Sequence, residues 1–118
     1  MTTIELAHAA AALCRESRFT EVKDSYWSDD IVAIEAMKGP MARLEGRAAV
    51  MHMVGWWNAN HMVHETTAEG LFVCHDDFAL VAEIDVTPKD QPRMKMRKLV
   101  EYKTAGGKIV GERYFYAM

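Results

Sequence analysis

A chain of 118 residues is long enough for one folded domain and too short for two domains of ordinary size. Half of the residues are hydrophobic and 26% are charged, a composition typical of a globular protein with one core. The net charge of −3, without a block of basic residues, argues against a surface that binds nucleic acid.

The N-terminal quarter of the sequence predicts two helices. Residues 3–17 (TIELAHAAAALCRES) are rich in alanine, and their larger apolar residues recur at helical spacing, with Thr3 placed to cap the start. Apolar residues at positions 19, 22 and 26 indicate a second, short helix that ends near Ser28.

Two features of the sequence bear on the compartment. The apolar run Leu6–Leu13 is interrupted by His8 and has no basic segment before it, so it predicts neither a signal peptide nor a membrane span. Cys14 and Cys74 lack the spacing of a metal site or a CxxC pair, and two reduced thiols fit better than a single disulfide. The cytoplasm is therefore the expected location, with no membrane partner.

The middle of the chain predicts a strand, a loop and a third helix. Residues 31–37 have extended character, with Ala33, Glu35 and Met37 on one face. The segment KGPMARLEG that follows holds two glycines and a proline, which predict a loop. Residues 47–60 (RAAVMHMVGWWNAN) return to helical spacing.

Four strands are expected in the C-terminal half. Apolar and polar residues alternate along them, and the segments CHDD, PKDQP and TAGG supply the turns. The expected strands are residues 61–73, 78–87, 94–104 and 108–116. This order of elements predicts an α+β domain in which helices pack on one face of a curved antiparallel sheet.

The element order and three segments, SDDIVAIEA, LEGRAAVMHMVGWWNANH and GGKIVGERYFY, resemble the SnoaL-like branch of the nuclear transport factor 2-like superfamily. The resemblance spans nearly the whole chain, so residues 1–118 are expected to form a single SnoaL-like domain. It implies a cone-shaped barrel made by a strongly curved antiparallel sheet, with the three helices of the N-terminal half packed on its concave face. Members include ketosteroid isomerase, polyketide cyclases, dehydratases and proteins that only bind or assemble, so the site must decide the function.

Ketosteroid isomerase can be compared with this chain residue by residue. The resemblance places its catalytic base, on the first strand, at Glu35. The acid and the tyrosine of its oxyanion hole fall on Lys98 and on about Ala11. A base is therefore expected without the two donors that stabilise a dienolate, which argues against steroid isomerisation by that mechanism.

Three charged residues are expected to meet in the cavity and to be the catalytic residues. Alternation along residues 94–104 puts Lys98 on the apolar face of its strand, where an unpaired ammonium is costly to bury. The resemblance puts Glu35 and Glu112 in the same cavity, where one or both carboxylates would hold Lys98 charged. The other residues expected to line the pocket are Met94, Met96, Tyr114, Tyr116, His64 and Trp57.

Three interpretations of this set remain open. The first is cofactor-free proton transfer next to a carbonyl (isomerisation, cyclisation or dehydration), with Glu35 as base, Lys98 stabilising the enolate oxygen and Glu112 orienting Lys98. The second is a non-catalytic domain for ligand binding or assembly, and the third is a purely structural ion pair of Lys98 and Glu112 near the barrel mouth. The first two predict a small apolar or polycyclic ligand.

Two further pairs of polar residues allow more than one interpretation. His61 and His64 lie three apart in an expected strand and point to opposite faces, so no metal site is expected. One of them, His64 before His61, could line the cavity mouth as an acid–base, and the alternative is a histidine bonded to backbone. Glu83 and Asp85 share a face, and arginines on the neighbouring strands favour the outer face of the sheet over the pocket.

The outer face of the sheet predicts a homodimer contact. Helices cover one side of the expected sheet only, and alternation assigns Leu99, Ile109 and Phe115 to the other side among charged residues. This is more apolar surface than a monomer is expected to leave in water.

Overall fold

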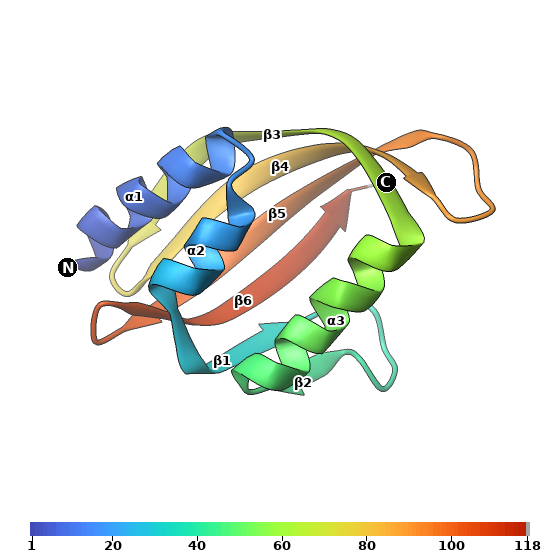
Figure 1. Cartoon of the computed structure of the whole chain (residues 1–118). Helices are drawn as coiled ribbons and strands as arrows, with labels where there is room; N and C mark the ends of the chain where they lie inside the picture. The colour runs from blue at the N-terminus through green and yellow to red at the C-terminus, as the bar shows by residue number, and fades with distance from the viewer. Residues whose placement is uncertain (118) are drawn as a thin grey trace.

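The structure, a computed structural model, describes residues 1–117 as an α+β domain (Figure 1). The helices are α1 (Thr3–Arg15), α2 (Phe19–Tyr26) and α3 (Arg47–Asn60). The strands are β1 (Trp27–Ile34), β2 (Arg43–Glu45), β3 (His61–Cys74), β4 (Asp77–Pro88), β5 (Met94–Ala105) and β6 (Lys108–Ala117). The helices lie on the concave side of the sheet, as the sequence predicted.

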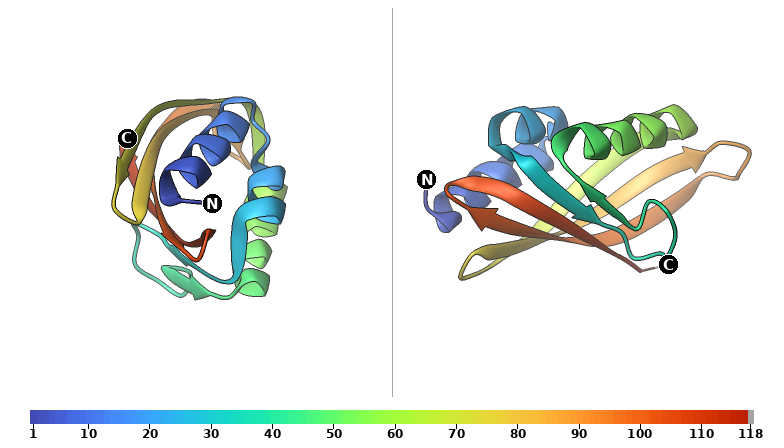
Figure 2. Two further views of the ribbon diagram at one scale, coloured as in Figure 1. Left: turned by 90° about the vertical axis from the view of Figure 1, so that its left-hand side faces the viewer. Right: turned by 90° about the horizontal axis from the view of Figure 1, so that it is seen from below.

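The strands form one sheet in the order β2-β1-β6-β5-β4-β3. Neighbouring strands run antiparallel except for β1 and β6, which run parallel, so the sheet is mixed rather than purely antiparallel. Side chains alternate with the same period in both kinds of pairing, and the sequence pattern therefore could not reveal the parallel pair. The edge strands β2 and β3 are not bonded to each other, and the curved sheet forms an open cone around α1 (Figure 2).

The first strand begins and ends earlier than predicted. It starts at Trp27, directly after α2, and ends at Ile34. Met37, expected on the inner face, lies beyond the strand with its side chain 64% exposed. The expected loop after it contains β2, which pairs with residues 32–34 of β1 and is too short to show a periodic pattern.

The start of α1 is fixed by a capping box. The hydroxyl of Thr2 accepts a hydrogen bond from the backbone N–H of Glu5 at 3.2 Å, and the carboxylate of Glu5 accepts one from the backbone N–H of Thr2 at 3.0 Å. Thr3, the predicted cap, is instead the first helical residue, and its hydroxyl meets that of Thr104 on β5 at 2.9 Å. This bond ties the helix to the sheet.

A bulge in the pairing of β5 and β6 moves one residue from the outer face into the core. Lys103 pairs with Gly111 whereas Thr104 pairs with Ile109, so Val110 is the extra residue. Thr104 keeps the regular alternation of β5 and is buried, and the bulge brings Ile109 to the same buried side. The expectation that Ile109 lies on the outer face was wrong, because the bulge shifts the alternation that the prediction assumed.

The core fills one end of the cone, where α1 packs against the inner faces of the long strands. Its largest fully buried side chains include Leu6 of α1, Phe78 of β4 and Ile109 of β6. At the other end α3 packs against β1, β2 and β3. The unfilled space between these two packed ends is the cavity described below. No helix within residues 1–117 is long and apolar enough to cross a membrane.

Candidate functional site

A cavity of about 390 Å³ lies between the helices and the inner face of the sheet. Its wall is mainly apolar and is formed by α2, α3 and the inner faces of β3, β4, β5 and β6, with Trp57 of α3 on one side. The charged side chains that border it are Lys23, Glu35, Lys98 and Glu112. The three residues expected to be catalytic, Glu35, Lys98 and Glu112, therefore border the same cavity. Lys23, which was not expected there, borders it as well.

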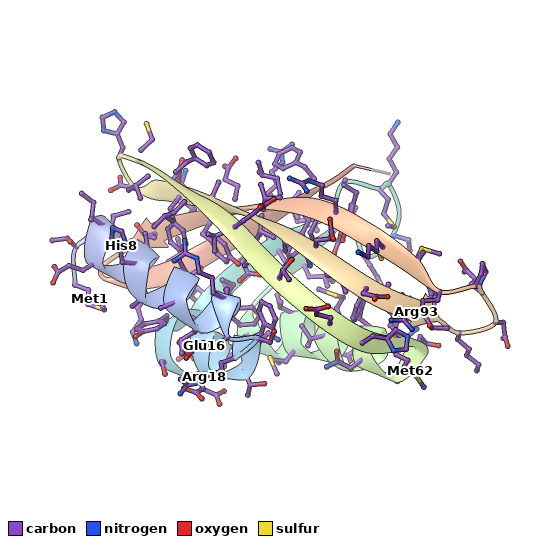
Figure 3. All side chains as sticks on the ribbon, turned by 90° about the horizontal axis from the view of Figure 1, so that it is seen from above. Met1, His8, Glu16, Arg18, Met62 and Arg93 are labelled. Carbon is purple, nitrogen blue, oxygen red and sulfur yellow. The ribbon has the colours of Figure 1, made fainter. Side chains whose placement is uncertain are left out.

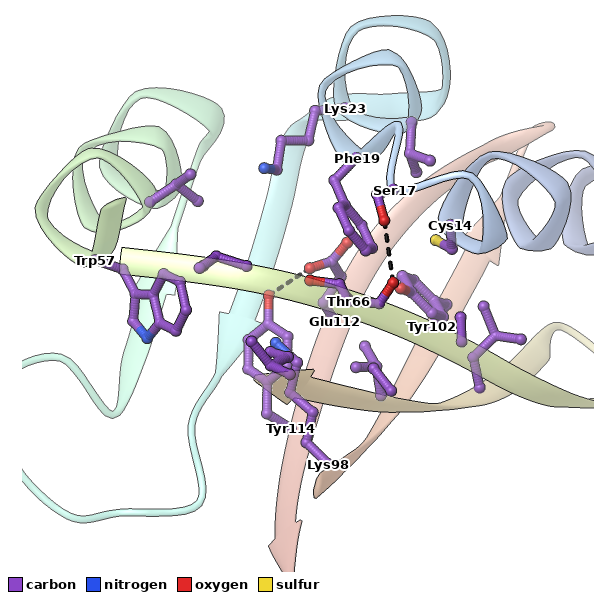
Figure 4. Close-up of a pocket in the computed structure, with 18 of the residues that line it drawn as sticks. Cys14, Ser17, Phe19, Lys23, Trp57, Thr66, Lys98, Tyr102, Glu112 and Tyr114 are labelled. Atoms are coloured by element: carbon purple, nitrogen blue, oxygen red, sulfur yellow. Dashed lines mark hydrogen bonds between the residues drawn. The ribbon is translucent and has the colours of Figure 1, made fainter. Parts of the chain in front are cut away.

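Glu112 lies at the floor of the cavity and is held by two neutral donors. The indole N–H of Trp27 donates to its Oε1 at 2.8 Å, and the hydroxyl of Tyr114 donates to its Oε2 (Figure 4). Glu112 and Tyr114 are two residues apart on β6 and therefore share the inner face, while Trp27 opens the neighbouring strand β1.

Burial raises the pKa of Glu112, because a charged carboxylate is poorly solvated there. The hydrogen bonds from Tyr114 and Trp27 act in the opposite direction, as do the more distant ammonium groups of Lys98 and Lys23. Burial likewise raises the pKa of Tyr114, and the nearby carboxylate adds to that effect. The hydroxyl of Tyr114 is thus the proton donor of this pair.

Lys98 extends from the inner face of β5 into the cavity without forming an ion pair. Its Nζ lies 5.1 Å from the ring centroid of Tyr114, and no carboxylate oxygen of the described residues is within 4.0 Å of it. Glu112, expected to orient Lys98, instead binds Trp27 and Tyr114. Burial lowers the pKa of Lys98, although the charges of Glu112 and Glu35 partly oppose this shift.

Lys23 enters the same cavity from the opposite wall, from α2 (Figure 4). Its Nζ lies 5.9 Å from the ring centroid of Trp27, and burial lowers its pKa against the attraction of Glu112 and Asp24. Lys23 could not be identified from the sequence, because a lysine next to an apolar residue on a short helix is most often a surface residue.

Glu35 stands at the side of the cavity, just beyond the end of β1. Its backbone N–H donates to the carbonyl of Ala42 at 2.8 Å, which fixes the chain at this point. The hydroxyl of Tyr116 donates to Oε2 of Glu35 at 2.9 Å, and no side chain or backbone group in residues 1–116 bonds its Oε1. Burial and the neighbouring carboxylate raise the pKa of Tyr116, so this tyrosine also remains a donor.

The cavity end nearest α1 carries Cys14 and Tyr102, which the sequence did not single out. Tyr102 is buried and stacks on Phe78 with ring centroids 4.6 Å apart. Burial raises the pKa of the Cys14 thiol and that of the Tyr102 hydroxyl, so both groups stay neutral. Cys14 and the exposed Cys74 are both free thiols, as the sequence predicted.

Three of the residues expected to line the pocket do not border it. His64 is exposed on β3, where its Nε2 lies 2.7 Å from the hydroxyl of Thr87. Met94 and Met96 share the inner face of β5 with Lys98, but they lie beyond the cavity toward the start of that strand. Trp57, Tyr114 and Tyr116 do border the cavity.

His61 is tied to the helix that precedes it. Its ring stacks on Trp57 with centroids 4.1 Å apart, and its Nδ1 lies 2.7 Å from the backbone oxygen of Trp57. His61 thus takes the backbone-bonded alternative, whereas His64 bonds a side-chain hydroxyl. Among residues 1–117 no group of three His, Cys, Asp or Glu side chains could hold a metal ion.

Glu83 and Asp85 lie on the outer face of the sheet, as favoured from the sequence. Asp85 accepts two hydrogen bonds from Arg93, at 2.9 and 2.8 Å, at the end of the sheet that is far from Met1 (Figure 3). Glu83 lies 3.7 Å from both Lys95 and Arg97. Neither carboxylate borders the cavity.

The chain is similar to one known protein family and to several solved structures. The model of the SnoaL-like domain matches residues 1–116. A crystal structure from Mesorhizobium loti, whose name describes a SnoaL-like polyketide cyclase and, in brackets, a carbohydrate phosphatase, is 38% identical. The match covers 98% of this chain and 100% of that chain, with a TM-score of 0.93.

Two more distant structures share the fold. A protein from Bacillus subtilis named as an isomerase is 18% identical over 99% of this chain and 90% of its own, with a TM-score of 0.76. A protein from Catenulispora acidiphila with a ketosteroid isomerase-like fold, solved with trimethylamine, is 18% identical over 97% and 86%, with a TM-score of 0.71. No curated protein matched the chain. These similarities confirm the resemblance predicted from the sequence.

Proposed function

Because the chain belongs to the SnoaL-like domain family, we propose that its cavity takes a small, largely apolar carbonyl compound and moves a proton at the carbon next to the carbonyl. A volume of about 390 Å³ and a mainly apolar wall suit a hydrophobic ketone or a phenolic polycycle. The reaction requires a base and a group that stabilises the enolate oxygen, and it requires no cofactor.

The carboxylate of Glu35 is the observation that carries this proposal. Glu35 borders the cavity, its Oε2 is held by the hydroxyl of Tyr116 at 2.9 Å, and its Oε1 has no hydrogen-bond partner within residues 1–116. A carboxylate oriented through one oxygen can accept a substrate proton with the other. Glu35 is therefore the proposed base, and Tyr116 is its positioning residue.

Lys98 supplies the positive charge on the other side of the ligand. Its ammonium has no carboxylate partner within 4.0 Å among the described residues, so it can turn toward a carbonyl oxygen that becomes negative. Glu112 acts indirectly, because it fixes the hydroxyl of Tyr114, the ring of which lies next to Lys98.

Proton abstraction can be tested without the natural substrate. Hydrophobic ketones are incubated with the protein in D₂O, and NMR follows the exchange of hydrogen for deuterium at the carbon next to the carbonyl. We expect exchange above the rate of the buffer, and we expect Glu35→Gln to lose it, because the amide cannot accept a proton.

The matched control is Glu83→Gln, which removes a carboxylate from the outer face of the sheet. It should leave the exchange rate unchanged. Equal exchange by wild type, Glu35→Gln and buffer across ketones that bind would overturn the catalytic proposal.

One observation favours a binding domain without catalysis as a second candidate. The hydroxyls of Tyr114 and Tyr116 already satisfy Glu112 and Glu35, which is the arrangement of a pocket that receives an apolar ligand without reacting with it. Ligands that raise the melting temperature of the protein but show no exchange in D₂O would select this candidate.

A homodimer through the outer face of the sheet accompanies either function. Leu99 and Phe115 are 36% and 41% exposed there, next to each other in the register of β5 and β6. Light scattering should give about twice the chain mass of 13.4 kDa, and Phe115→Lys should reduce it to one chain mass, because a charge opposes burial of this surface. A monomer at high concentration would exclude this contact.

A further inference from the structure

Lys98 has the surroundings of a nucleophilic amine. In the sheet register its neighbours are Ala82 on β4 and Tyr116 on β6, and Val100 follows it on the inner face of β5. Ala82 and Val100 are buried apolar residues. The amine therefore projects from an apolar patch into the cavity, above the ring of Tyr114.

We propose that Lys98 forms a covalent imine with aldehyde or ketone ligands that enter the cavity. The inference rests on the proposed function for its carbonyl ligand, and it adds a covalent step in which the ligand is held by the protein. A substrate that is free to form an imine, an unhindered aldehyde or ketone, is therefore favoured over an ester or an amide.

Two features of the cavity favour a neutral amine at Lys98. No carboxylate of the described residues lies within 4.0 Å of its Nζ, so no direct ion pair fixes the proton there. Lys23 enters from the opposite wall, and two ammonium groups in one apolar cavity repel each other. Burial lowers the pKa of Lys98 and Lys23 adds to that shift, while the charges of Glu112 and Glu35, which are not in contact with Nζ, partly oppose it.

Imine formation begins at the nitrogen of Lys98. The nitrogen lone pair of Lys98 forms a C–N bond with the carbonyl carbon, the C=O π electrons move to oxygen, and a proton passes from nitrogen to that oxygen. A second proton converts this hydroxyl to water, which leaves as the C=N bond forms and gives an iminium. The hydrogen-bonded pair of Tyr114 and Glu112 can supply that proton, since burial raises the pKa of both groups.

The iminium connects the covalent step to the proposed base. A positive C=N⁺ group withdraws electrons from the adjacent carbon more strongly than a hydrogen-bonded carbonyl does. Glu35 could then take the proton from that carbon, and the electron pair would move into the C=C bond of an enamine. Lys98 thereby acts as a covalent electron sink and not only as an ammonium that stabilises the enolate oxygen.

The test traps the imine with borohydride. Wild-type protein and the variants Lys98→Arg and Lys95→Arg are incubated with cinnamaldehyde, reduced, digested and mapped by mass spectrometry. Arginine keeps the charge but is not a nucleophile near neutral pH, so we expect the adduct on residue 98 to be lost in Lys98→Arg. Lys95 lies on the outer face of the same strand, and Lys95→Arg should keep the adduct on Lys98.

A second probe guards against a misfolded Lys98→Arg variant. The diketone 2,4-pentanedione reacts with a buried amine to give a stable conjugated adduct that absorbs in the near ultraviolet. Lys98→Met, checked by circular dichroism for native helix content, should show no such band while wild type does. Trapping on Lys23 or on surface lysines only, or equal trapping by folded Lys98 variants, would overturn the proposal.

Failure of the imine can be told apart from failure of the proposed function. If Lys98→Arg exchanges ketone hydrogens in D₂O as fast as wild type, Lys98 acts only through its charge, which overturns the imine and leaves Glu35 as the base. If Glu35→Gln loses exchange yet still traps cinnamaldehyde on Lys98, the result supports imine formation at Lys98 followed by proton abstraction by Glu35. Trapping that persists where no protein shows exchange supports the imine and contradicts proton transfer.

Discussion

The two faces of β4 and β5 carry similar charged side chains but hold them differently. On the outer face, Glu83 and Asp85 each meet basic partners within 3.7 Å, and these partners are Arg93, Lys95 and Arg97. On the inner face, Lys98 has no carboxylate within 4.0 Å among the described residues. The outer charges are thus paired at the surface, where an ion pair contributes little to stability. The inner charge of Lys98 stays available to a ligand.

The inner carboxylates also differ from the outer ones, because neutral donors hold them in place of basic side chains. Glu112 is held by Trp27 and Tyr114, and Glu35 is held by Tyr116, all of them neutral donors. A neutral donor fixes the direction of a carboxylate without cancelling its charge, whereas an ion pair would cancel it. The cavity therefore keeps charge that a ligand can use, at some cost in stability.

The largest predicted effect comes from removing the most buried of these carboxylates. Glu112→Ala leaves the indole N–H of Trp27 and the hydroxyl of Tyr114 without their acceptor, and it opens a small void. We expect a loss of about 3 kcal/mol in the free energy of unfolding, measured with urea. The matched change on the outer face, Glu83→Ala, should cost less than about 1 kcal/mol. Equal losses would contradict the difference between the faces.

The features that follow from the periodicity of apolar residues could be predicted from the sequence. The pattern of residues 47–60 gave α3 with its observed bounds, and Lys98 was found because a lysine interrupts an apolar face. Alternation reports the face of a residue only while the register is regular. It therefore failed at Ile109, which directly precedes the bulge residue Val110, and at Met37, which lies beyond the end of β1.

The neutral donors of the site were harder to predict. Trp27 meets Glu112 through the parallel pairing of β1 and β6, an 85-residue separation that no local pattern encodes. Lys23 lies beside the buried Val22 on α2, where helical spacing does not separate a cavity residue from a surface one. Contacts between distant segments thus decide the hydrogen-bond partners of the inner charges. The sequence placed these charges in the cavity but did not identify their partners.

The second prediction concerns the pH dependence of stability on the inner face. Burial raises the pKa of Glu112 above its ordinary value of 4.5, so the folded protein binds this proton more tightly than the unfolded chain. Its contribution is fully present below the unfolded pKa and is lost as the pH rises through the raised folded pKa. Urea unfolding from pH 4 upward should show this decline in wild type, and Glu112→Gln should remove it. An unchanged pH profile in that variant would mean that Glu112 titrates normally.

A smaller effect is expected in the coupling free energy between charged residues, measured by one double-mutant cycle on each face of the sheet. Lys98→Met and Glu112→Gln probe the inner pair, and Arg97→Met and Glu83→Gln probe the outer pair. The inner groups are not in direct contact, yet the low dielectric of the cavity should give a coupling of about 1 kcal/mol. The outer pair, although 3.7 Å apart, should couple by less than about 0.5 kcal/mol because water screens it. A larger coupling on the outside would reverse the comparison.

The smallest effect is expected at Asp85, and its sign is opposite to that of Glu112. The hydrogen bonds from Arg93 lower the pKa of Asp85 below its ordinary value of 3.8, so the folded state favours the charged carboxylate. Its contribution is present above the unfolded pKa and is lost as the pH falls through the lowered folded pKa. Arg93→Met should therefore lower the free energy of unfolding slightly near neutral pH and reduce its loss at acidic pH. The decline with rising pH that is attributed to Glu112 should not change. Because the pair lies at the surface, 0.5 M salt should reduce the difference between Arg93→Met and wild type, as screening acts within about 10 Å of exposed charges. A salt-independent difference would place Asp85 in a buried setting, and the contrast between the two faces would then rest on Lys98 alone.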